Sequence, residues 1–509
     1  MKVALVVSPY KSSSYRMGES LGIKYLAAVL EHNGIGVDVF QANVLNLTVE
    51  AIVNRLLKKP YDLIGFSLPF SGLLPTTIEI IRLLRISTIK PHVTVGGHFA
   101  TFEDRELLES FPEVNSVVRF EGENTLLELV ACLKKPNKLH TIKGLSYRLR
   151  DSIYVNEPRD LIKDLDTLPF PKRDITSKYL GNPHFLMISS RGCYGNCTFC
   201  SVCSFYRIPS GSKWRIRSVD NVLDELYFLQ RDWGAKTISF LDDNFIGSCE
   251  KGRARALKIA DAIKSKKLYI TWSIDCRAQD IKKSTIKSLK EAGLKNVFLG
   301  IESGCQSQLN RYGKNTTVNE NRKAIMILKE MGVDVECGFI IFDAYTSIEE
   351  IKENLRFISE FDIGTFNVIS NRLQVYGGTR IKEILSRENN LVKNYFEYDY
   401  SFRDKKVESI YKIITNALKP IHDVDILFKK AIFIEQTERF EKNLSKLFEL
   451  RKRLSSVVVM KLNEVIQFVE KNDNTKASLA HFTRQFKNDI INFINNFRQQ
   501  IETIMYLQK

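Results

Sequence analysis

The sequence predicts an α/β protein built from three successive parts, and three observations support this prediction. Residues 1–140 alternate short apolar runs with stretches of helical periodicity, which is typical of βαβ units in a parallel sheet. The same alternation returns over residues 184–390. Residues 391–509 keep mainly the helical pattern, and glycine does not occur after Gly378. We expect residues 141–183, which show little periodicity, to link the first two parts.

The first part is expected to be a doubly wound domain of the Rossmann or flavodoxin type. Five apolar runs of strand length are separated by helical stretches, as parallel pairing requires. Ligands of such sheets bind beyond the carboxyl ends of the strands. The expected strands are Lys2–Val7, Val37–Phe40, Leu63–Ser67, Val93–Val95 and Ser116–Val118.

The second part is expected to be a partial (β/α)6 barrel that is similar to a TIM barrel. Six βα units follow one another, whereas a complete TIM barrel needs eight. In such barrels the loops after the strands build the active site. The expected strands are residues 184–189, 236–241, 268–274, 296–300, 334–342 and 364–370.

The third part is expected to be a small helical bundle. Apolar residues recur at helical spacing, for example at Leu444, Leu447, Leu450 and Leu454. A coiled-coil arm is the alternative, but the heptads are not sustained.

The composition is that of a soluble globular protein. The net charge of +16 is spread along the chain, so we expect a solvated basic surface and no nucleic-acid partner. No apolar stretch approaches the roughly 18 residues of a transmembrane helix, and the first apolar run is too short for a signal peptide. The nine cysteines are an odd number and four of them crowd into residues 193–203, which argues against a disulfide framework. We therefore expect a cytoplasmic protein.

Three cysteines on one short loop indicate a metal cluster. Cys193, Cys197 and Cys200 follow directly after the first strand of the second part. Three thiolates leave one iron of a cubane open, and an open position is typical of a catalytic metal site. Cys203 could close the site as a fourth ligand, as in a zinc knot or an electron carrier. Zinc sites usually take two separated pairs of ligands, so we favour the open cluster.

The spacing Cys-x3-Cys-x2-Cys, with an aromatic residue before the last cysteine, resembles the signature of the radical S-adenosylmethionine (SAM) superfamily. The resemblance extends over roughly residues 1–385 to the subgroup with an N-terminal cobalamin-binding (B12-binding) domain. The segments that carry it are Asp62–Ser67, Val95–His98, Glu121–Glu123, Leu165–Pro171, Trp214–Ser218 and Phe240–Phe245.

This resemblance implies three cofactors: a [4Fe–4S] cluster on the three cysteines, SAM and cobalamin. In that family an electron from an external reductant, flavodoxin or ferredoxin, reaches the cluster and cleaves SAM. The resulting 5′-deoxyadenosyl radical abstracts hydrogen from the substrate. The protein then has to position the cofactors and to exclude water.

By the same resemblance, SAM lies at the carboxyl ends of the barrel strands. An aromatic side chain is expected near the adenine, and carboxylates are expected at the amino group and at the ribose. Two alternatives stay open, because the aspartates after the second strand could cap a helix and the pair after the third strand could be a surface ion pair. The expected SAM-binding residues are Phe199, Asp242, Asp243, Asp275, Arg277, Glu302, Ser303 and Phe339.

Cobalamin is implied at the carboxyl ends of the first domain's strands, where glycines would admit a flat corrin ring. The Asp-x-His-x-x-Gly motif that supplies a lower histidine ligand in other cobalamin proteins is absent, which implies base-off binding without a histidine below the cobalt. The alternative is a degenerate domain kept for packing. The expected cobalamin-binding residues are Pro9, Tyr10, Ser67, Leu68, Pro69, Gly96, Gly97, His98, Gly122 and Glu123.

Two segments depart from the pattern of the family. Phe342–Tyr345 replaces a frequent Gly-x-Pro-Gly turn, and Tyr376 stands where proline is frequent. Both segments face the substrate cavity in the family, so the resemblance does not identify the substrate.

The leading hypothesis is a cobalamin-dependent methyltransferase that acts on an unactivated carbon of a small-molecule or peptide substrate. It predicts that S-adenosylhomocysteine and 5′-deoxyadenosine form together. A cyclase or rearrangement enzyme with the same cofactors would form no S-adenosylhomocysteine. An alternative of another class is a cobalamin and iron–sulfur sensor or electron carrier, which would never cleave SAM.

Overall fold

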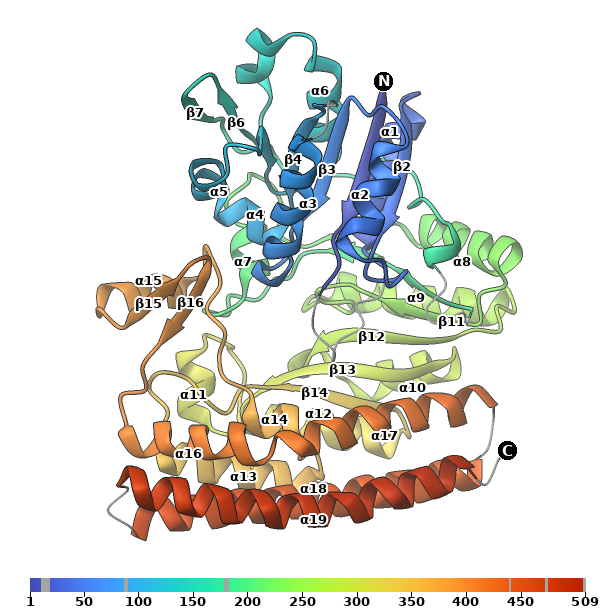
Figure 1. The fold of residues 1–509 in the computed structure, drawn as a ribbon. Coiled ribbons are helices and arrows are strands. Elements are labelled where there is room, and N and C mark those ends of the chain that lie inside the picture. Colours follow the sequence, from blue (N-terminus) through green and yellow to red (C-terminus); the bar gives the residue numbers. More distant parts are fainter. Residues whose placement is uncertain (11–18, 87–89, 178–182, 439–440, 472–474, 507–509) are drawn as a thin grey trace.

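The structure is a computed structural model, and it describes residues 1–10, 19–86, 90–177, 183–438, 441–471 and 475–506 of the chain. Figure 1 shows two sheets, one above the other, and a layer of long helices beneath the second sheet. This architecture of two α/β parts followed by helices confirms the predicted fold class.

The first sheet has seven strands in the order β2-β1-β3-β4-β5-β6-β7. The five predicted strands are all present and pair in parallel. Helices cover both faces, which is why the inner strands are continuous apolar runs. The strand order reverses between β1 and β3, where doubly wound sheets bind their ligands. The parallel strands are β1 (Lys2–Val7), β2 (Gly36–Gln41), β3 (Leu63–Ser67), β4 (His92–Gly96) and β5 (Ser116–Val118).

The helices of this part connect and cover these strands. They are α1 (Leu21–His32), α2 (Val49–Leu57), α3 (Leu74–Ile86), α4 (His98–Phe102), α5 (Asp104–Ser110) and α6 (Glu123–Cys132).

The segment 141–183, predicted as a linker, contains part of the first sheet. Strands β6 (Leu145–Leu149) and β7 (Ser152–Val155) form a hairpin that pairs antiparallel with β5. Only the following stretch runs between the two sheets as mostly irregular backbone, and residues 178–182 lie outside the described part. The hairpin strands are short, and β7 is largely exposed, so they leave only a weak apolar pattern in the sequence.

The second sheet is parallel, with the strand order β14-β13-β12-β11-β8. Side chains alternate between the helices and the interior of the partial barrel, so that in β13 Leu299 and Ile301 are buried while Phe298 is 40% exposed on the other face. The strands are β8 (His184–Met187), β11 (Thr237–Phe240), β12 (Thr271–Arg277), β13 (Leu294–Glu302) and β14 (Asp334–Phe339).

Helices and two short strands complete this part of the chain. The short strands β9 (Ser190–Arg191) and β10 (Arg215–Ile216) pair with each other beside the barrel. The helices are α7 (Ser201–Phe205), α8 (Val219–Trp233), α9 (Glu250–Ser265), α10 (Lys283–Glu291), α11 (Gln306–Arg311), α12 (Val318–Glu330), α13 (Ile348–Phe361), α14 (Phe366–Ser370) and α15 (Arg380–Arg387).

The predicted sixth strand at residues 364–370 was wrong, because this segment forms helix α14. Thr365 caps the helix and accepts a hydrogen bond from the backbone N–H of Val368. Val368 and Ile369 are buried in the core that the barrel shares with the C-terminal helices. A short buried helix and a buried strand have the same apolar signature, so periodicity could not separate them. Among the described residues β14 is therefore the last strand of the sheet, and beyond it a single parallel bridge joins Phe342 to Arg372.

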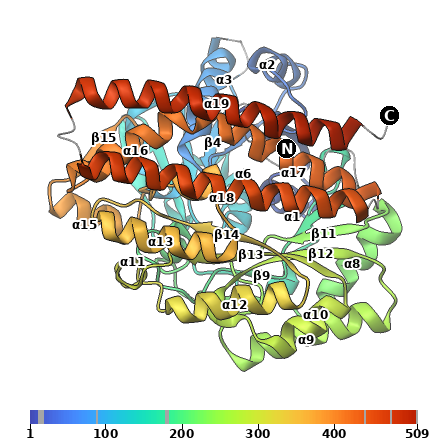
Figure 2. The same cartoon turned by 90° about the horizontal axis from the view of Figure 1, so that it is seen from below.

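The C-terminal part begins with a hairpin, which the prediction of helices from residue 391 did not include. Strands β15 (Leu391–Asn394) and β16 (Glu397–Tyr400) precede α16 (Lys405–Ala417), α17 (Lys419–Glu438), α18 (Glu441–Lys471) and α19 (Lys476–Tyr506). Figure 2 shows α18 and α19 running alongside each other below the barrel.

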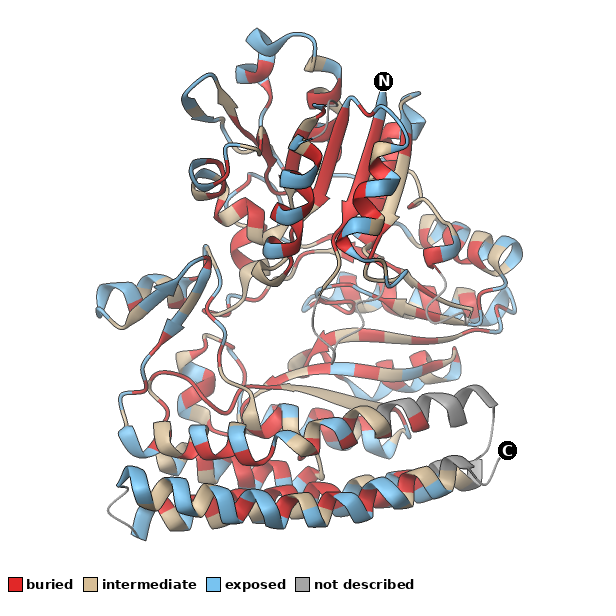
Figure 3. Ribbon diagram, viewed as in Figure 1, coloured by how far each residue is buried: buried red, intermediate tan, exposed pale blue. Residues whose placement is uncertain are grey.

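The buried side chains of the C-terminal helices are part of the same core as the barrel helices. Their outer faces are exposed, as the alternating colours in Figure 3 show. No helix in the described part of the chain combines the length and the apolar character that crossing a membrane requires.

Candidate active site

The cysteine loop leaves the carboxyl end of β8 and crosses the top of the barrel. Gly192 has φ +84°, and a Cβ atom there would clash with the carbonyl oxygen of Lys213, so this turn requires glycine. Two hydrogen bonds hold the loop: the N–H of Gly195 donates to Cys193 Sγ (3.4 Å) and that of Thr198 donates to the carbonyl of Tyr312 (2.8 Å). The fold therefore places the three predicted ligands together on one constrained turn.

The surroundings of Cys197 favour the thiolate, which is the form that binds metal. A hydrogen bond from the thiol of Cys203 lowers the pKa of Cys197 to about 5, and the charges of Lys314 and Arg277 act in the same direction. Arg277 Nη1 donates to Cys197 Sγ over 3.3 Å. Burial raises the pKa of the Cys193 thiol. The loop thus carries a built-in positive environment for bound thiolates.

The four cysteines of the loop are not equally suited to bind a metal. In the described part of the chain, no three His, Cys, Asp or Glu side chains lie close enough together to hold one metal ion. The cysteines of a cubane bind different iron atoms and need not converge on one point. Hydrogen bonds to Cys197 and Cys200 raise the pKa of Cys203, so that this cysteine favours the thiol, whereas a metal ligand is a thiolate.

The two aspartates after β11 have different surroundings. Asp242 is buried and accepts hydrogen bonds from the backbone N–H of Ser189 (2.7 Å) and from the hydroxyls of Ser189 and Ser190 (both 2.6 Å). Asp243 is exposed and accepts from the N–H of Gly192 (2.9 Å). Loss of water around it raises the pKa of Asp243 to about 6. Asp242 therefore holds the start of the loop, whereas Asp243 faces open space.

Three further carboxylates surround the barrel interior: Asp275 on β12, Glu302 on β13 and Glu336 on β14. Asp275 on β12 has its pKa raised to about 7, first by burial and then by Asp242, Asp243 and Glu336. Glu302 at the end of β13 pairs with Lys314 Nζ at 2.7 Å. An interior of this kind can receive a cation and can hold a proton at Asp275 near neutral pH.

The other predicted SAM contacts lie around this interior. Ser303 is buried, and its hydroxyl is hydrogen-bonded to Gln308 and Asn354, so it supports the turn after β13. Phe199 packs edge-to-face on Tyr312, with ring centroids 5.6 Å apart. Phe339 lies at the end of β14, on the wall of a large cavity.

The predicted cobalamin residues after β1, β3 and β4 lie at the carboxyl edge of the first sheet. The segments 67–69 and 96–98 pack tightly: a Cβ atom on Gly97 (φ +114°) would lie 2.8 Å from the carbonyl oxygen of Leu68. Tyr10 packs edge-to-face on Phe70 at 5.2 Å. Pro9 precedes Tyr10, and its carbonyl accepts from the hydroxyl of Thr76 (2.7 Å).

His98 and Glu123 contact the second part of the chain. The His98 ring stacks on Phe205 of α7 with centroids 4.0 Å apart, and burial lowers its pKa to about 4. Arg191, two residues before Cys193, donates to Glu121 (2.9 Å) and to Glu123 (2.6 Å). The turn at Gly122 therefore ties the first sheet to the cysteine loop.

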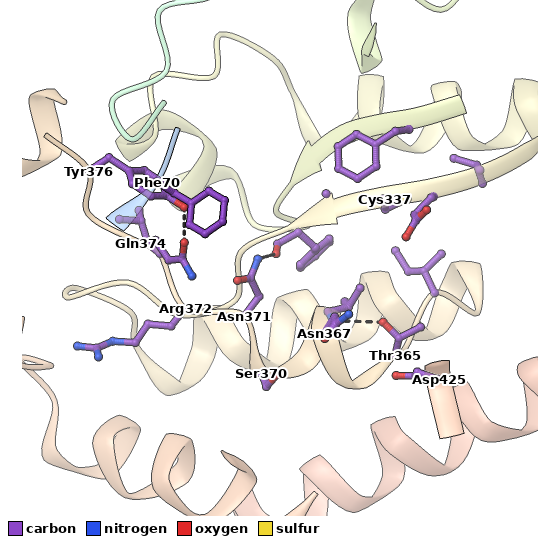
Figure 4. Close-up of a pocket in the computed structure, with 18 of the residues that line it drawn as sticks. Phe70, Cys337, Thr365, Asn367, Ser370, Asn371, Arg372, Gln374, Tyr376 and Asp425 are labelled. Carbon is purple, nitrogen blue, oxygen red and sulfur yellow. Dashed lines mark hydrogen bonds between the residues drawn. The ribbon is translucent and has the colours of Figure 1, made fainter. Parts of the chain in front are cut away.

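A cavity of about 1580 Å³ lies between the two sheets and the C-terminal elements. The first sheet contributes Tyr10, Phe70 and Phe99, and the barrel contributes the whole of β14. Figure 4 shows Phe70 next to Tyr376 at one end and Asn367 and Asp425 towards the other. This volume exceeds the about 300–1,000 Å³ of ordinary small-molecule pockets.

Comparison with known protein families accounts for this arrangement. The B12 binding domain model matches residues 8–130, and the radical SAM superfamily model matches residues 187–358. A protein of Pyrococcus horikoshii named "Uncharacterized methyltransferase PH0819" is 31% identical over 404 residues, which are 77% of this chain and 84% of that protein. The chain belongs to the cobalamin-binding radical SAM family.

Two other similarities are informative for this radical SAM protein. The anaerobic magnesium-protoporphyrin IX monomethyl ester cyclase of Cereibacter sphaeroides is 32% identical over 279 residues, which are 52% of this chain and only 43% of the cyclase. The solved structure of the cobalamin-dependent SAM radical enzyme OxsB, with aqua-cobalamin and SAM bound, has a TM-score of 0.78 at 22% identity, covering 99% of this chain and 80% of OxsB. The latter shows that the fold, including the C-terminal helices, is shared.

Several residues of this radical SAM site could not be found from the sequence. Lys314 lies in a loop after α11 and forms an ion pair with Glu302. Phe298, in the middle of β13, lines the cavity. Neither belongs to a motif. Phe70 and Asn371 also line the cavity, and only the approach of separate parts of the chain makes them part of a site.

Proposed function

We propose that this protein is a methyltransferase that uses cobalamin and radical SAM chemistry to methylate an unactivated carbon. The observation that carries the proposal is the shared cavity. Tyr10, Phe70 and Phe99 from the predicted cobalamin edge and Phe339 from the predicted SAM site line one continuous space. One substrate in that space could reach both cofactors. The similarity to a protein named as a methyltransferase supports the same reaction.

The donor set fits the cofactors. Cys193, Cys197 and Cys200 would hold the [4Fe–4S] cluster, because Cys197 already favours the thiolate. The carboxyl edge around Gly97 would hold cobalamin. When bound, the cluster with SAM supplies a hydrogen-abstracting radical, and cobalamin supplies the methyl group.

The chain's own residues would bind, orient and exclude water. Asp243 and Asp275 present carboxyl groups to the barrel interior, where the amino group of SAM would find a partner. Arg277 and Lys314 would balance the charge of the thiolates. The remaining predicted SAM-binding and cobalamin-binding residues stay proposals with the roles given above.

The test is anaerobic reconstitution with iron, sulfide and hydroxocobalamin, followed by SAM and a strong reductant. We expect S-adenosylhomocysteine together with methylcobalamin, and slow release of 5′-deoxyadenosine even without substrate. The Cys197→Ala variant is the control and should lose only the 5′-deoxyadenosine. A protein that never forms S-adenosylhomocysteine would overturn the methyltransferase proposal.

A second candidate is a ring-closing or rearranging enzyme with the same cofactors. The 32% identity to the cyclase over 279 residues is the observation that favours it. The same assay decides, because the cyclase alternative yields 5′-deoxyadenosine without S-adenosylhomocysteine.

We further propose a cytoplasmic setting with flavodoxin or ferredoxin as the electron donor. All nine cysteines are free, as a reducing compartment maintains them, and a reduced cluster requires such a donor. Replacing the chemical reductant with flavodoxin, its reductase and NADPH tests this, and no turnover with any flavodoxin or ferredoxin would contradict it.

A further inference from the structure

The outer edge of β14 faces the cavity, and at its carboxyl end the side chain of Asn371 bonds to it. β14 is the last strand of the second sheet, and no other strand in the described residues pairs with its outer edge. Residues Asp334 to Gly338 are all half-buried, whichever face their side chains occupy. Every residue of the strand lines the cavity. The open feature is therefore the backbone edge itself.

The backbone groups that point to this edge can be assigned. The N–H of Ile340 donates to the carbonyl of Glu302 (2.7 Å), so Ile340 points towards β13. Because alternate residues point to opposite sides of a strand, the N–H and C=O groups of Val335, Cys337 and Phe339 point to the open edge. The carboxamide of Asn371 confirms this direction, because it donates to the carbonyl of Phe339. Val335 and Cys337 therefore present a strand-like row of donors and acceptors.

The opposite wall of the cavity is also suited to a polypeptide backbone. Figure 4 shows Asn367 below β14, with Thr365 and Asp425 beside it. Carboxamides both donate and accept hydrogen bonds, as a peptide group does. Phe298, which is 40% exposed, adds an apolar contact from the neighbouring strand.

The expected cofactors do not explain this part of the cavity. SAM and cobalamin sites of such folds lie at the carboxyl ends of the strands, which for β14 is the end at Phe339. Asp334 lies at the other end of the strand, about 17 Å away at the usual rise per residue. A ligand that uses the whole edge has to be long and extended.

We propose that the substrate is an extended peptide that pairs with the outer edge of β14 and thereby becomes a sixth strand. This inference rests on the proposed function and names its substrate class. Main-chain hydrogen bonds to Val335 and Cys337 supply the affinity, and side chains on alternate residues contact the two faces. The register delivers one side chain to the cofactor end near Phe339. A compact small molecule that binds near Phe339 would not reach the strand edge at Val335.

The first experiment measures amide hydrogen–deuterium exchange of the reconstituted full-length protein. The probe is a random library of N-acetylated, C-amidated hexapeptides, and the matched control is a mixture of N-acetylated amino-acid amides at the same total concentration. We expect the hexapeptides to slow exchange in the segment containing β14 at least about tenfold, since edge pairing protects its outward amides. Equal slowing by the amino-acid amides, or none by the hexapeptides, overturns the proposal.

The second experiment removes one edge donor. Val335→Pro deletes the outward N–H, and proline is tolerated on edge strands, whereas Val335→Ala shortens the side chain but keeps the N–H. We expect the proline variant to bind the hexapeptides at least about tenfold more weakly than the alanine variant. Equal binding by the two variants overturns the proposal.

Failure of the peptide proposal and failure of the methyl-transfer proposal give different results. Protection of β14 without S-adenosylhomocysteine means that a peptide binds and that the reaction is not methylation. Formation of S-adenosylhomocysteine without protection of β14 means that the protein is a methyltransferase whose substrate is not a peptide bound at this edge.

Discussion

The cysteine loop and the carboxyl edge of the first sheet form their sites in opposite ways. The loop collects its three donors within residues 193–200. The edge of the first sheet assembles its contacts from separate turns after β1, β3 and β4. We expect single substitutions in the loop to remove a function completely, whereas single substitutions at the edge should remove only a share of it.

The largest effect is expected for Cys197→Ala. It removes one of three cluster ligands, so the iron content and 5′-deoxyadenosine release should fall to background, while bound cobalamin stays at the wild-type level. Iron analysis, product chromatography and the cobalamin absorbance measure the three quantities. The matched variant Cys203→Ala should keep its iron. Loss of iron from that variant would mean that Cys203 is a ligand and that the loop is a closed site.

The contrast between the two regions also explains what the sequence could predict. The cysteines, the parallel strands of both sheets and the helical end were evident, because spacing and periodicity are local properties. The secondary structure of residues 364–370 was not evident, because their packing against the C-terminal helices decided between strand and helix.

The same reasoning applies to individual site residues. Asp243 could be placed because it directly follows a strand end. The partners of Glu302 and Glu123 could not, since Lys314 and Arg191 are brought to them only by tertiary structure. The open edge of β14 could not be predicted either, because it depends on residues 364–370 forming a helix and not a sixth strand.

Arg191 joins the two regions, and Arg191→Ala should give the next largest effect. Its side chain is 10% exposed, between Glu121 and Glu123, which are each 6% exposed. Removing the arginine leaves two buried carboxylates with less compensation, and we expect a loss of about 3–5 kcal/mol in the free energy of unfolding. Anaerobic urea denaturation measures it.

The control for Arg191 is an ion pair on the surface. Arg231→Ala breaks a contact with Asp232 in which the arginine is 78% exposed, and it should leave the free energy of unfolding nearly unchanged. Similar losses for the two variants would show that Arg191 does not hold the two parts together.

Gly97→Ala tests the first sheet alone. The added Cβ would lie 2.8 Å from the carbonyl oxygen of Leu68, and the φ of +114° is unfavourable for alanine, so we expect a loss of about 1–3 kcal/mol. Bound cobalamin should fall in part, with the iron content unchanged. Gly22→Ala in α1 is the matched control, because a Cβ there meets nothing within 4 Å, and it should raise stability by about 0.5–1 kcal/mol. If the Gly97→Ala variant binds as much cobalamin as the wild type, the turn at Gly97 is not part of the cobalamin site.

The smallest expected effect is electrostatic and concerns Asp275, whose carboxylate neighbours come from β14 and the turn after β11. Burial, and then Asp242, Asp243 and Glu336, raise its pKa from 3.8 to about 7. Between these pH values the folded protein binds a proton that the unfolded chain has lost, so rising pH costs stability until it passes about 7. Asp275→Asn removes this penalty, and its stability relative to wild type should grow by about 1–2 kcal/mol from pH 4 to pH 8, a value reduced for partial solvent access. Urea denaturation at the two pH values measures it. If the difference in stability between Asp275→Asn and wild type is independent of pH, the carboxylates from separate strands do not raise the pKa of Asp275 together.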